Sequence, residues 1–190
     1  MLMRTLQVLA LVMAMTSPAL LANAAQVSEY ELKTAYLYNF ALFVTWPSEI
    51  DPTITVCTIG EDRFGASIEQ LHNRKARGKR LEVHRAVDLK QASSCHMLYI
   101  AQSEQQNMAA ILDALRGSSV LTISDLPLAN APKADGDVVV VSAPADTPPR
   151  STITLILENK RLMFDVDAAA ARQAGLTMSS RLLYLARQVY

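Results

Sequence analysis

The sequence predicts an α/β fold: a single three-layer domain with a mostly parallel sheet, helices on both faces, and a C-terminal β-hairpin plus helices. Helical and strand-like patterns alternate along the chain, which favours parallel strands joined by helices. Two predicted strands, Met97–Ile100 and Val120–Ile123, are continuously apolar, as in a sheet covered on both faces. The 190 residues, 51% of them hydrophobic, suffice for one domain with its own core and exclude a disordered chain.

The clearest predicted helix runs over Ser28–Val44. A capping box, S-x-x-E, opens it at Ser28, and Glu29 and Lys33 have the i,i+4 spacing of an ion pair on the outer face. After Lys33 nearly every residue is apolar or aromatic. We therefore expect a helix that is buried nearly all round or docks on a partner, and that ends before Pro47.

The remaining elements follow from periodicity, caps and turn residues. Besides the two apolar strands, strands are predicted at Ile54–Ile59 and Leu81–Val87, and helices from Asp62 to about Leu71 and over Gln105–Leu115. Asp125–Arg150 is less regular, with five of the eight prolines and a β-rich run at Val138–Val141. A hairpin over Ser151–Leu157 and Arg161–Val166 comes next, then a helix over Ala168–Ala174 between Asp167 and Gly175, and a last helix from Ser179 or Ser180 through Val189, with Leu182, Leu183, Leu185 and Ala186 turned inward.

The first 24 residues, Met1–Ala24, have the organisation of a secretory signal peptide. Arg4 forms the positive region, an apolar run covers Leu6–Met15, and Ala22-Asn23-Ala24 is an A-x-A cleavage site. The apolar run is shorter than the roughly 20 residues that span a bilayer. We therefore expect export, and a mature chain from near Ala25 with 17 cationic and 18 acidic residues.

The two cysteines, Cys57 and Cys95, both belong to the expected mature chain. In an oxidising compartment an isolated pair most often forms a disulfide. A reactive thiol, a redox sensor and a metal site are the alternatives. Cys95 and His96 are adjacent, so in a strand their side chains would point to opposite faces, which does not favour joint ligation of a metal.

Signals for catalysis or cofactor binding are missing from the sequence. Its equal numbers of basic and acidic residues argue against general nucleic-acid binding. The sequence contains no glycine-rich phosphate loop, no G-x-S-x-G and no H-E-x-x-H, and its three histidines lack metal-site spacing. We therefore predict no catalytic residue, no metal site and no cofactor.

Five cations lie within seven residues before the second predicted strand: Arg74, Lys75, Arg77, Lys79 and Arg80. Such a run is usually a solvated loop, and the alternative is a contact with an acidic partner surface or with lipid headgroups. Trp46, the sole tryptophan, is interpreted as a core residue, although tryptophan is also enriched at interface hot spots.

Several sequence blocks resemble one family of exported bacterial proteins. Residues 36–47 fit its Y-L-x-N-F-x-x-x-x-x-W-P block, with matches at Tyr36, Leu37, Asn39, Phe40, Trp46 and Pro47. The end block Phe164–Leu185 includes matches at Ser179, Ser180, Leu182 and Leu183. With further blocks at Ile54–Gly60, Cys95–Ile100 and Val120–Asp125, the chain from Ala25 to Tyr190 resembles the YfiR family, the DUF4154 domain.

The resemblance implies a periplasmic regulator, not an enzyme. Proteins of this kind bind the periplasmic domain of an inner-membrane diguanylate cyclase and repress it, which lowers cyclic-di-GMP and biofilm formation. An outer-membrane, peptidoglycan-associated lipoprotein can sequester the repressor. The resemblance also implies a disulfide between Cys57 and Cys95. The partner surface is expected near the first helix or in Val138–Lys160, and exposed apolar helices make a homodimer plausible.

Two other hypotheses remain at this point. A periplasmic small-molecule-binding or sensor module would place its ligand at the carboxyl ends of the parallel strands. A thiol oxidoreductase is disfavoured because the sequence has no C-x-x-C.

Overall fold

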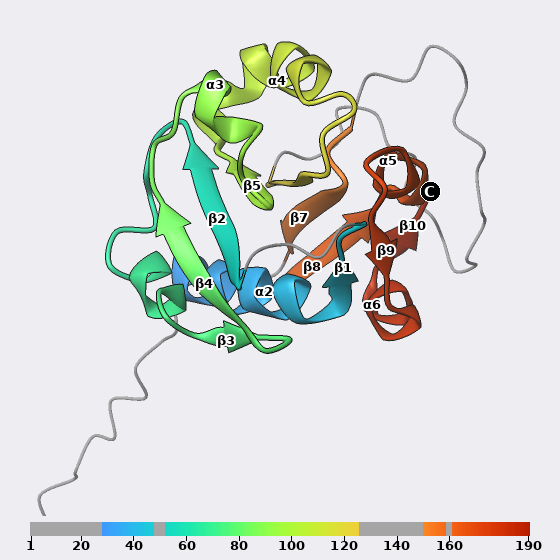
Figure 1. Ribbon diagram of the computed structural model, residues 1–190, viewed down its shortest axis with the longest axis horizontal. Helices are drawn as coiled ribbons and strands as arrows, with labels where there is room; N and C mark the ends of the chain where they lie inside the picture. The colour runs from blue at the N-terminus through green and yellow to red at the C-terminus, as the bar shows by residue number, and fades with distance from the viewer. Residues whose placement is uncertain (1–27, 48–51, 126–149, 159–160) are drawn as a thin grey trace, which may run out of the picture.

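The computed structural model describes residues 28–47, 52–125, 150–158 and 161–190, and Figure 1 shows their arrangement. The predicted signal peptide, the β-rich run Val138–Val141 and the tip of the C-terminal hairpin lie outside these residues. The described residues form an eight-stranded sheet with helices on both faces, which confirms the predicted α/β class.

The strands of this sheet, in order across it, are β10 (Gln188–Val189), β8 (Arg161–Val166), β7 (Ile153–Glu158), β6 (Leu121–Ser124), β5 (Met97–Ile100), β2 (Thr53–Ile59), β4 (Lys79–His84) and β3 (Lys75–Ala76). The central five, from β7 to β4, run parallel to one another, whereas β8 is antiparallel to β7 and β3 is antiparallel to β4. Read from β4 to β7, these five strands are the second, first, third, fourth and fifth along the chain, which is the order of a doubly wound sheet. A separate two-stranded sheet pairs β1 (Val44–Thr45) with β9 (Thr177–Met178).

Alternation along the central strands sends side chains to two separate apolar clusters. On β5, Met97 and Tyr99 belong to the larger cluster with α2 (Glu29–Phe43), while Leu98 and Ile100 belong to a smaller one. The smaller cluster lies against α3 (Leu89–Ala92) and α4 (Met108–Ala114). In Figure 1, α2 lies below the sheet and α3 and α4 lie above it, giving the three predicted layers.

The first helix, α2, begins with the predicted capping box. The Glu31 amide donates to Ser28 Oγ at 3.2 Å, and the Ser28 amide donates to a carboxylate oxygen of Glu31 at 2.7 Å. Its core-facing residues, Leu37, Phe40 and Ala41, are buried against the sheet. The extended backbone of Val44 ends the helix and starts β1.

Two predicted helices are shorter in the structure. Asp62 does not cap a helix, because its carboxylate accepts from the Phe64 amide two residues on. Gly65 then takes a positive φ of 55°, and the 3-10 turn η1 (Ile68–Leu71) forms in place of the predicted helix. The helix predicted over Gln105–Leu115 begins as the 3-10 segment η2 (Gln102–Asn107) and becomes α-helical at Met108. Neither start has the side-chain cap that fixed α2.

The strand predicted to reach Val87 ends at His84, because Ala86 adopts a left-handed φ of 51° and the chain turns away from the sheet. The C-terminal segment agrees with prediction through its first helix. Helix α5 (Ala168–Gln173) forms as expected, capped by Asp167 and followed by Gly175 with φ 68°.

Helix α6 (Ser180–Leu185) stops well short of Val189, and the last residues pair with β8 as β10. There the Arg187 amide donates to the Phe164 carbonyl at 2.8 Å, so an open sheet edge outcompetes further helix. Leu185, predicted to point inward, is 58% exposed.

Candidate interaction surface

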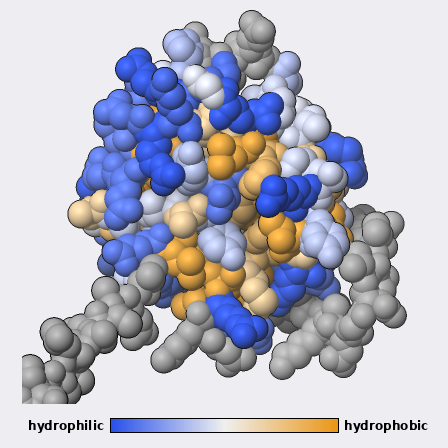
Figure 2. All heavy atoms as spheres, turned by 90° about the horizontal axis from the view of Figure 1, so that it is seen from below, coloured by the Kyte–Doolittle hydropathy of each residue, from blue (hydrophilic) through white to orange (hydrophobic). Residues whose placement is uncertain are grey.

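The side of α2 turned away from the sheet carries few polar groups. One stripe of the helix, which we call the α2 face, consists of Leu32, Ala35, Tyr36, Asn39, Leu42 and Phe43. Ala35 and Asn39 are exposed, and the other four are half-buried and also pack against the core. A surface helix normally shows charged or polar side chains at these positions. Figure 2 views the molecule from the side on which α2, β3 and α6 lie, and apolar residues gather in the middle of that view with hydrophilic residues around them.

Helix α6 extends this surface beyond the end of α2. Tyr184 and Leu185 are 88% and 58% exposed, although both are large and hydrophobic. The Ser179 amide donates to the Phe43 carbonyl at 2.9 Å, and the Arg181 guanidinium lies over the Phe43 ring. Exposed apolar side chains held on short, fixed helices are typical of protein-binding surfaces.

The five clustered cations lie in a hairpin beside α2, not in an open loop. Strands β3 and β4 are joined by the turn Arg77–Gly78, whose φ angles of 53° and 80° fit a type I′ hairpin. The Arg74 guanidinium stacks 3.7 Å from the centre of the Tyr38 ring, and the Tyr38 hydroxyl donates to the Lys75 carbonyl at 2.9 Å. These contacts fix the cationic hairpin, residues 74–80, at one edge of the α2 side.

Most residues of the family block hold the fold together. Leu37, Phe40, Trp46 and Leu182 are buried, and Leu183 is half-buried. Pro47 packs close to Gly175, where an added Cβ would lie 3.3 Å from the proline ring. Ser179 Oγ accepts from the Leu182 amide and caps α6, while Ser180 is exposed. Tyr36 donates from its hydroxyl to the Leu162 carbonyl at 2.6 Å, and Asn39 is exposed on the α2 face.

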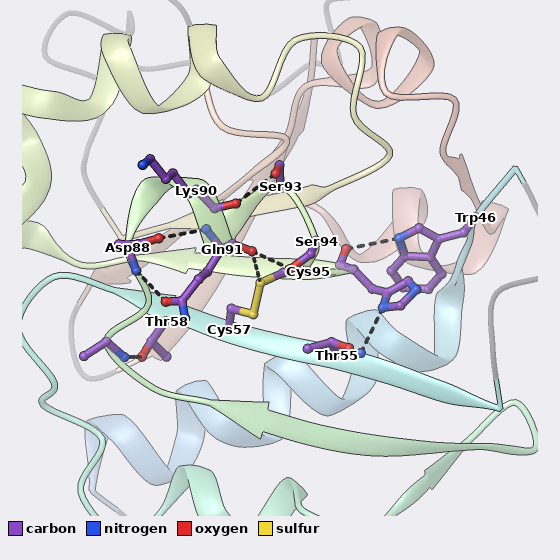
Figure 3. Close-up of a disulfide and its surroundings, with 12 residues drawn as sticks. Trp46, Thr55, Cys57, Thr58, Asp88, Lys90, Gln91, Ser93, Ser94 and Cys95 are labelled. Atoms are coloured by element: carbon purple, nitrogen blue, oxygen red, sulfur yellow. Dashed lines mark hydrogen bonds between the residues drawn. A yellow bond between two sulfur atoms is a disulfide. The ribbon is translucent and has the colours of Figure 1, made fainter.

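The disulfide between Cys57 and Cys95 is present and lies on the opposite side of the sheet (Figure 3). Both half-cystines are buried, with their Cα atoms 6.1 Å apart, and this bridge joins β2 to the turn before β5. The pairing leaves no free cysteine, so a resting reactive thiol is not part of this structure.

Trp46 fixes the same end of β5. Its indole Nε1 donates to the His96 carbonyl at 3.1 Å, while His96 Nδ1 accepts from the Thr55 amide at 3.0 Å. The hollow beside these residues, lined by Trp46, Ser93, Ser94, Cys95, His96, Ser119 and Val120, has a volume of about 160 Å³. Pockets that enclose drug-sized ligands are larger, about 300–1,000 Å³.

A buried ionic cluster is the main feature that sequence reasoning missed. Lys33 was predicted on the outer face of its helix, yet its side chain is 2% exposed. Its ammonium group lies 2.6 Å from Glu29 and 2.5 Å from Asp125, which immediately follows β6. The Tyr99 hydroxyl donates to the same Asp125 oxygen at 2.8 Å. A lysine among apolar neighbours is the one signal in the sequence that could have suggested this burial.

The cluster changes the protonation equilibria of its members. Burial disfavours the charged form of Lys33, but hydrogen bonds to Asp125 and Glu29 outweigh it, and the pKa is raised from its usual 10.5. Burial, together with the Asp125 charge and hydrogen bond, raises the pKa of Tyr99 far above 10.0. Both groups therefore remain protonated at neutral pH, and the cluster is an ion pair with a neutral phenol donor.

The usual ligand position of a doubly wound sheet is filled by the protein's own side chains. Lys33 occupies the carboxyl end of β6. Between the ends of β2 and β5, Ser103 Oγ accepts from the Glu61 amide at 2.8 Å, and a Cβ on Gly60 would lie only 2.5 Å from that hydroxyl. This packing gives no support to a small-molecule site at the switch point.

The described residues contain no group of three side chains that could hold a metal ion. No helix within the same residues has the length and apolar character needed to cross a bilayer.

The comparison with known families is decisive. A family described as YfiR/HmsC-like matches residues 30–187, nearly the whole described chain. The chain belongs to the YfiR/HmsC-like family. Membership supports a periplasmic regulatory role connected with cyclic-di-GMP, and the family is regulatory, not catalytic. The search of curated proteins gave no match.

Two solved structures are similar to this chain at 10% sequence identity. A conserved domain protein from Vibrio cholerae O1 biovar El Tor has a TM-score of 0.50 and is matched over 86% of this chain and 60% of its own. A Streptococcus pneumonia ABC domain in complex with L-Trp has a TM-score of 0.41, over 73% of this chain and 55% of its own. The chain thus spans less than two thirds of either structure, and the first likeness concerns the fold alone.

Proposed function

We propose that this protein is exported through the signal peptide Met1–Ala24 and represses an inner-membrane diguanylate cyclase by binding its periplasmic domain. Repression lowers cyclic-di-GMP and, with it, biofilm formation. Family membership supports the regulatory role, and the α2 face with α6 is the observation that carries the proposed mode of action.

The proposed contact follows from side-chain chemistry. Tyr184 and Leu185 would be the anchors, because large side chains that become fully buried dominate interface energies. The partner patch would have an apolar centre, and acidic groups near Arg181 would complement its charge. No catalytic group is needed in this mechanism, since binding alone shifts the cyclase toward its inactive state.

The binding experiment titrates the purified mature protein with the periplasmic domain of a cyclase from the same organism. We expect Tyr184→Ala and Leu185→Ala each to weaken binding about thirtyfold, as hot-spot truncations do. Leu89→Ala is the matched control, because Leu89 is an exposed leucine, 39% accessible, on the other side of the sheet. Equal binding by all three variants, or no binding of the wild type at micromolar concentration, would contradict the proposal.

The cellular experiment measures cyclic-di-GMP in a deletion strain. We expect a rise on deletion that is reversed by the full-length protein but not by a version lacking Met1–Ala24. An unchanged level of cyclic-di-GMP would contradict the proposed repression.

Release of the cyclase by an outer-membrane, peptidoglycan-associated lipoprotein belongs to the same proposal, and co-purification of that lipoprotein with the repressor tests it. A homodimer stays a prediction that sedimentation can check.

A further inference from the structure

We infer that the cationic hairpin, residues 74–80, docks on the anionic headgroups of a phospholipid bilayer. This role is separate from the proposed protein contact and does not depend on it. The first observation is the distribution of charge. Five of the 18 cations lie in these seven residues, and the other 13 face 18 acidic residues elsewhere in the chain. The neutral molecule is therefore strongly polar, and an anionic surface would turn the hairpin toward itself.

The second observation concerns four of these cations, Arg74, Lys75, Arg77 and Arg80. Lys75 and Arg80 lie directly opposite each other across the two strands, an arrangement that is destabilising for like charges. Within the described residues, no carboxylate forms a salt bridge with Arg74, Lys75, Arg77 or Arg80, all of which are exposed.

Four arginines outside the hairpin do form salt bridges. Arg63, Arg85, Arg116 and Arg187 each lie within salt-bridge distance of an acidic side chain. Arg172 and Arg181 form no salt bridge within the described residues either, but they are isolated along the chain, whereas four such cations are concentrated in residues 74–80. This concentration points to an external anion.

The third observation is that the hairpin is rigid. The Leu81 amide donates to the Arg74 carbonyl at 2.8 Å, the Asn73 amide donates to the Leu81 carbonyl at 2.9 Å, and Ala76 is fully buried. With the contacts of Tyr38 described above, these bonds hold the cation-bearing hairpin as a fixed ridge of backbone at the sheet edge, where Figure 1 shows β3 and β4. A preformed ridge loses little conformational entropy when it binds.

A lipid surface fits this ridge better than a second protein does. The exposed side chains of the hairpin are all basic, and its apolar residue Ala76 is buried, so it offers no aromatic or aliphatic anchor for a protein pocket. A layer of headgroup phosphates needs no anchor. It attracts each nearby lysine or arginine through charge, and guanidinium groups bind phosphate oxygens in a bidentate manner.

Vesicle co-sedimentation of the whole mature protein tests the inference. The probes are vesicles of phosphatidylethanolamine with phosphatidylglycerol, and vesicles of phosphatidylcholine alone. We expect binding to the anionic vesicles only, and a steep loss of binding as salt is added. Lys75→Gln with Arg80→Gln should weaken it about thirtyfold, because each cation near an anionic surface contributes about fivefold. Arg116→Gln with Arg172→Gln removes the same charge from exposed positions elsewhere and should change it less than about twofold.

Three results with vesicles would overturn the inference. They are no binding to anionic vesicles at low salt, equal binding to both kinds of vesicle, and equal loss in the two double variants. A hairpin variant that keeps vesicle binding but loses the cyclase domain would also overturn it, because the ridge would then be a protein contact. Melting curves show that each variant is folded, and binding to vesicles is measured without any cyclase, so failure here leaves the proposed repression untouched.

Discussion

The two faces of the sheet are stabilised by different means. The face covered by α2 carries the larger apolar cluster, to which α2, η1 and the C-terminal elements contribute. It also accommodates the buried Lys33. The opposite face carries a smaller cluster under α3 and α4, and a disulfide lies within it. The comparison teaches that a face with short helices relies on a covalent link, whereas a face with a long helix has enough packing to hold an ionic cluster.

The largest effect is expected from breaking the ionic cluster on the α2 side. Lys33→Ala would leave the Asp125 carboxylate buried without its cation, and should lower the free energy of unfolding by about 3–5 kcal/mol. Urea denaturation measures it. The control is Lys33→Met combined with Asp125→Leu, which removes both charges and should cost less than the single change. A single-variant loss below about 1 kcal/mol would mean that the pair is not a structural element.

The next effect tests the opposite face. Cys57→Ala with Cys95→Ala opens a loop of 38 residues and should lower the free energy of unfolding by about 4 kcal/mol. Reducing agent should destabilise the wild type by a similar amount and leave the double variant unchanged. A wild type whose unfolding is insensitive to full reduction would show that packing alone holds α3 and β5.

The third prediction concerns alkaline pH. Tyr99 and Lys33 have raised pKa values in the folded protein, so the unfolded chain loses these protons first as the pH rises. The stability they contribute is complete below about pH 10 and declines above it. Tyr99→Phe should cost about 2 kcal/mol at neutral pH and flatten that decline. The free energy of unfolding is measured against pH for the wild type and for Tyr99→Phe. If it declines equally in both above about pH 10, Tyr99 does not cause the decline.

The smallest effect compares two equivalent caps. Ser28 opens α2 and Asp88 opens α3, each in a reciprocal capping box. Replacing either by Ala should cost about 1 kcal/mol. Because the disulfide at Cys95 already restrains α3, the Asp88→Ala loss should grow once both cysteines are replaced, while the Ser28→Ala loss should not. Thermal unfolding of the combined variants measures this coupling, and additive losses at Asp88 would refute it.

Local sequence signals located the elements they could fully specify. The capping box at Ser28, the cap at Asp167, the left-handed Gly175 and the apolar strand Met97–Ile100 all formed as predicted. Each depends on residues a few positions apart, so neighbouring chemistry is sufficient. The disulfide also formed, because the choice of partner for two cysteines is limited to one.

The sequence by itself therefore determined the fold class, the first helix, the central strands, the cysteine pair and the family. Tertiary structure decided what depended on distant partners. Lys33 is buried because Asp125, 92 residues away, supplies its counter-charge, and the last residues form β10 because β8 leaves a sheet edge open. It also set the cationic hairpin beside α2 at Tyr38, and α6 beside the end of α2 at Phe43. Periodicity reports which residues share one element, but only packing brings separate elements together, and the proposed functions depend on that packing.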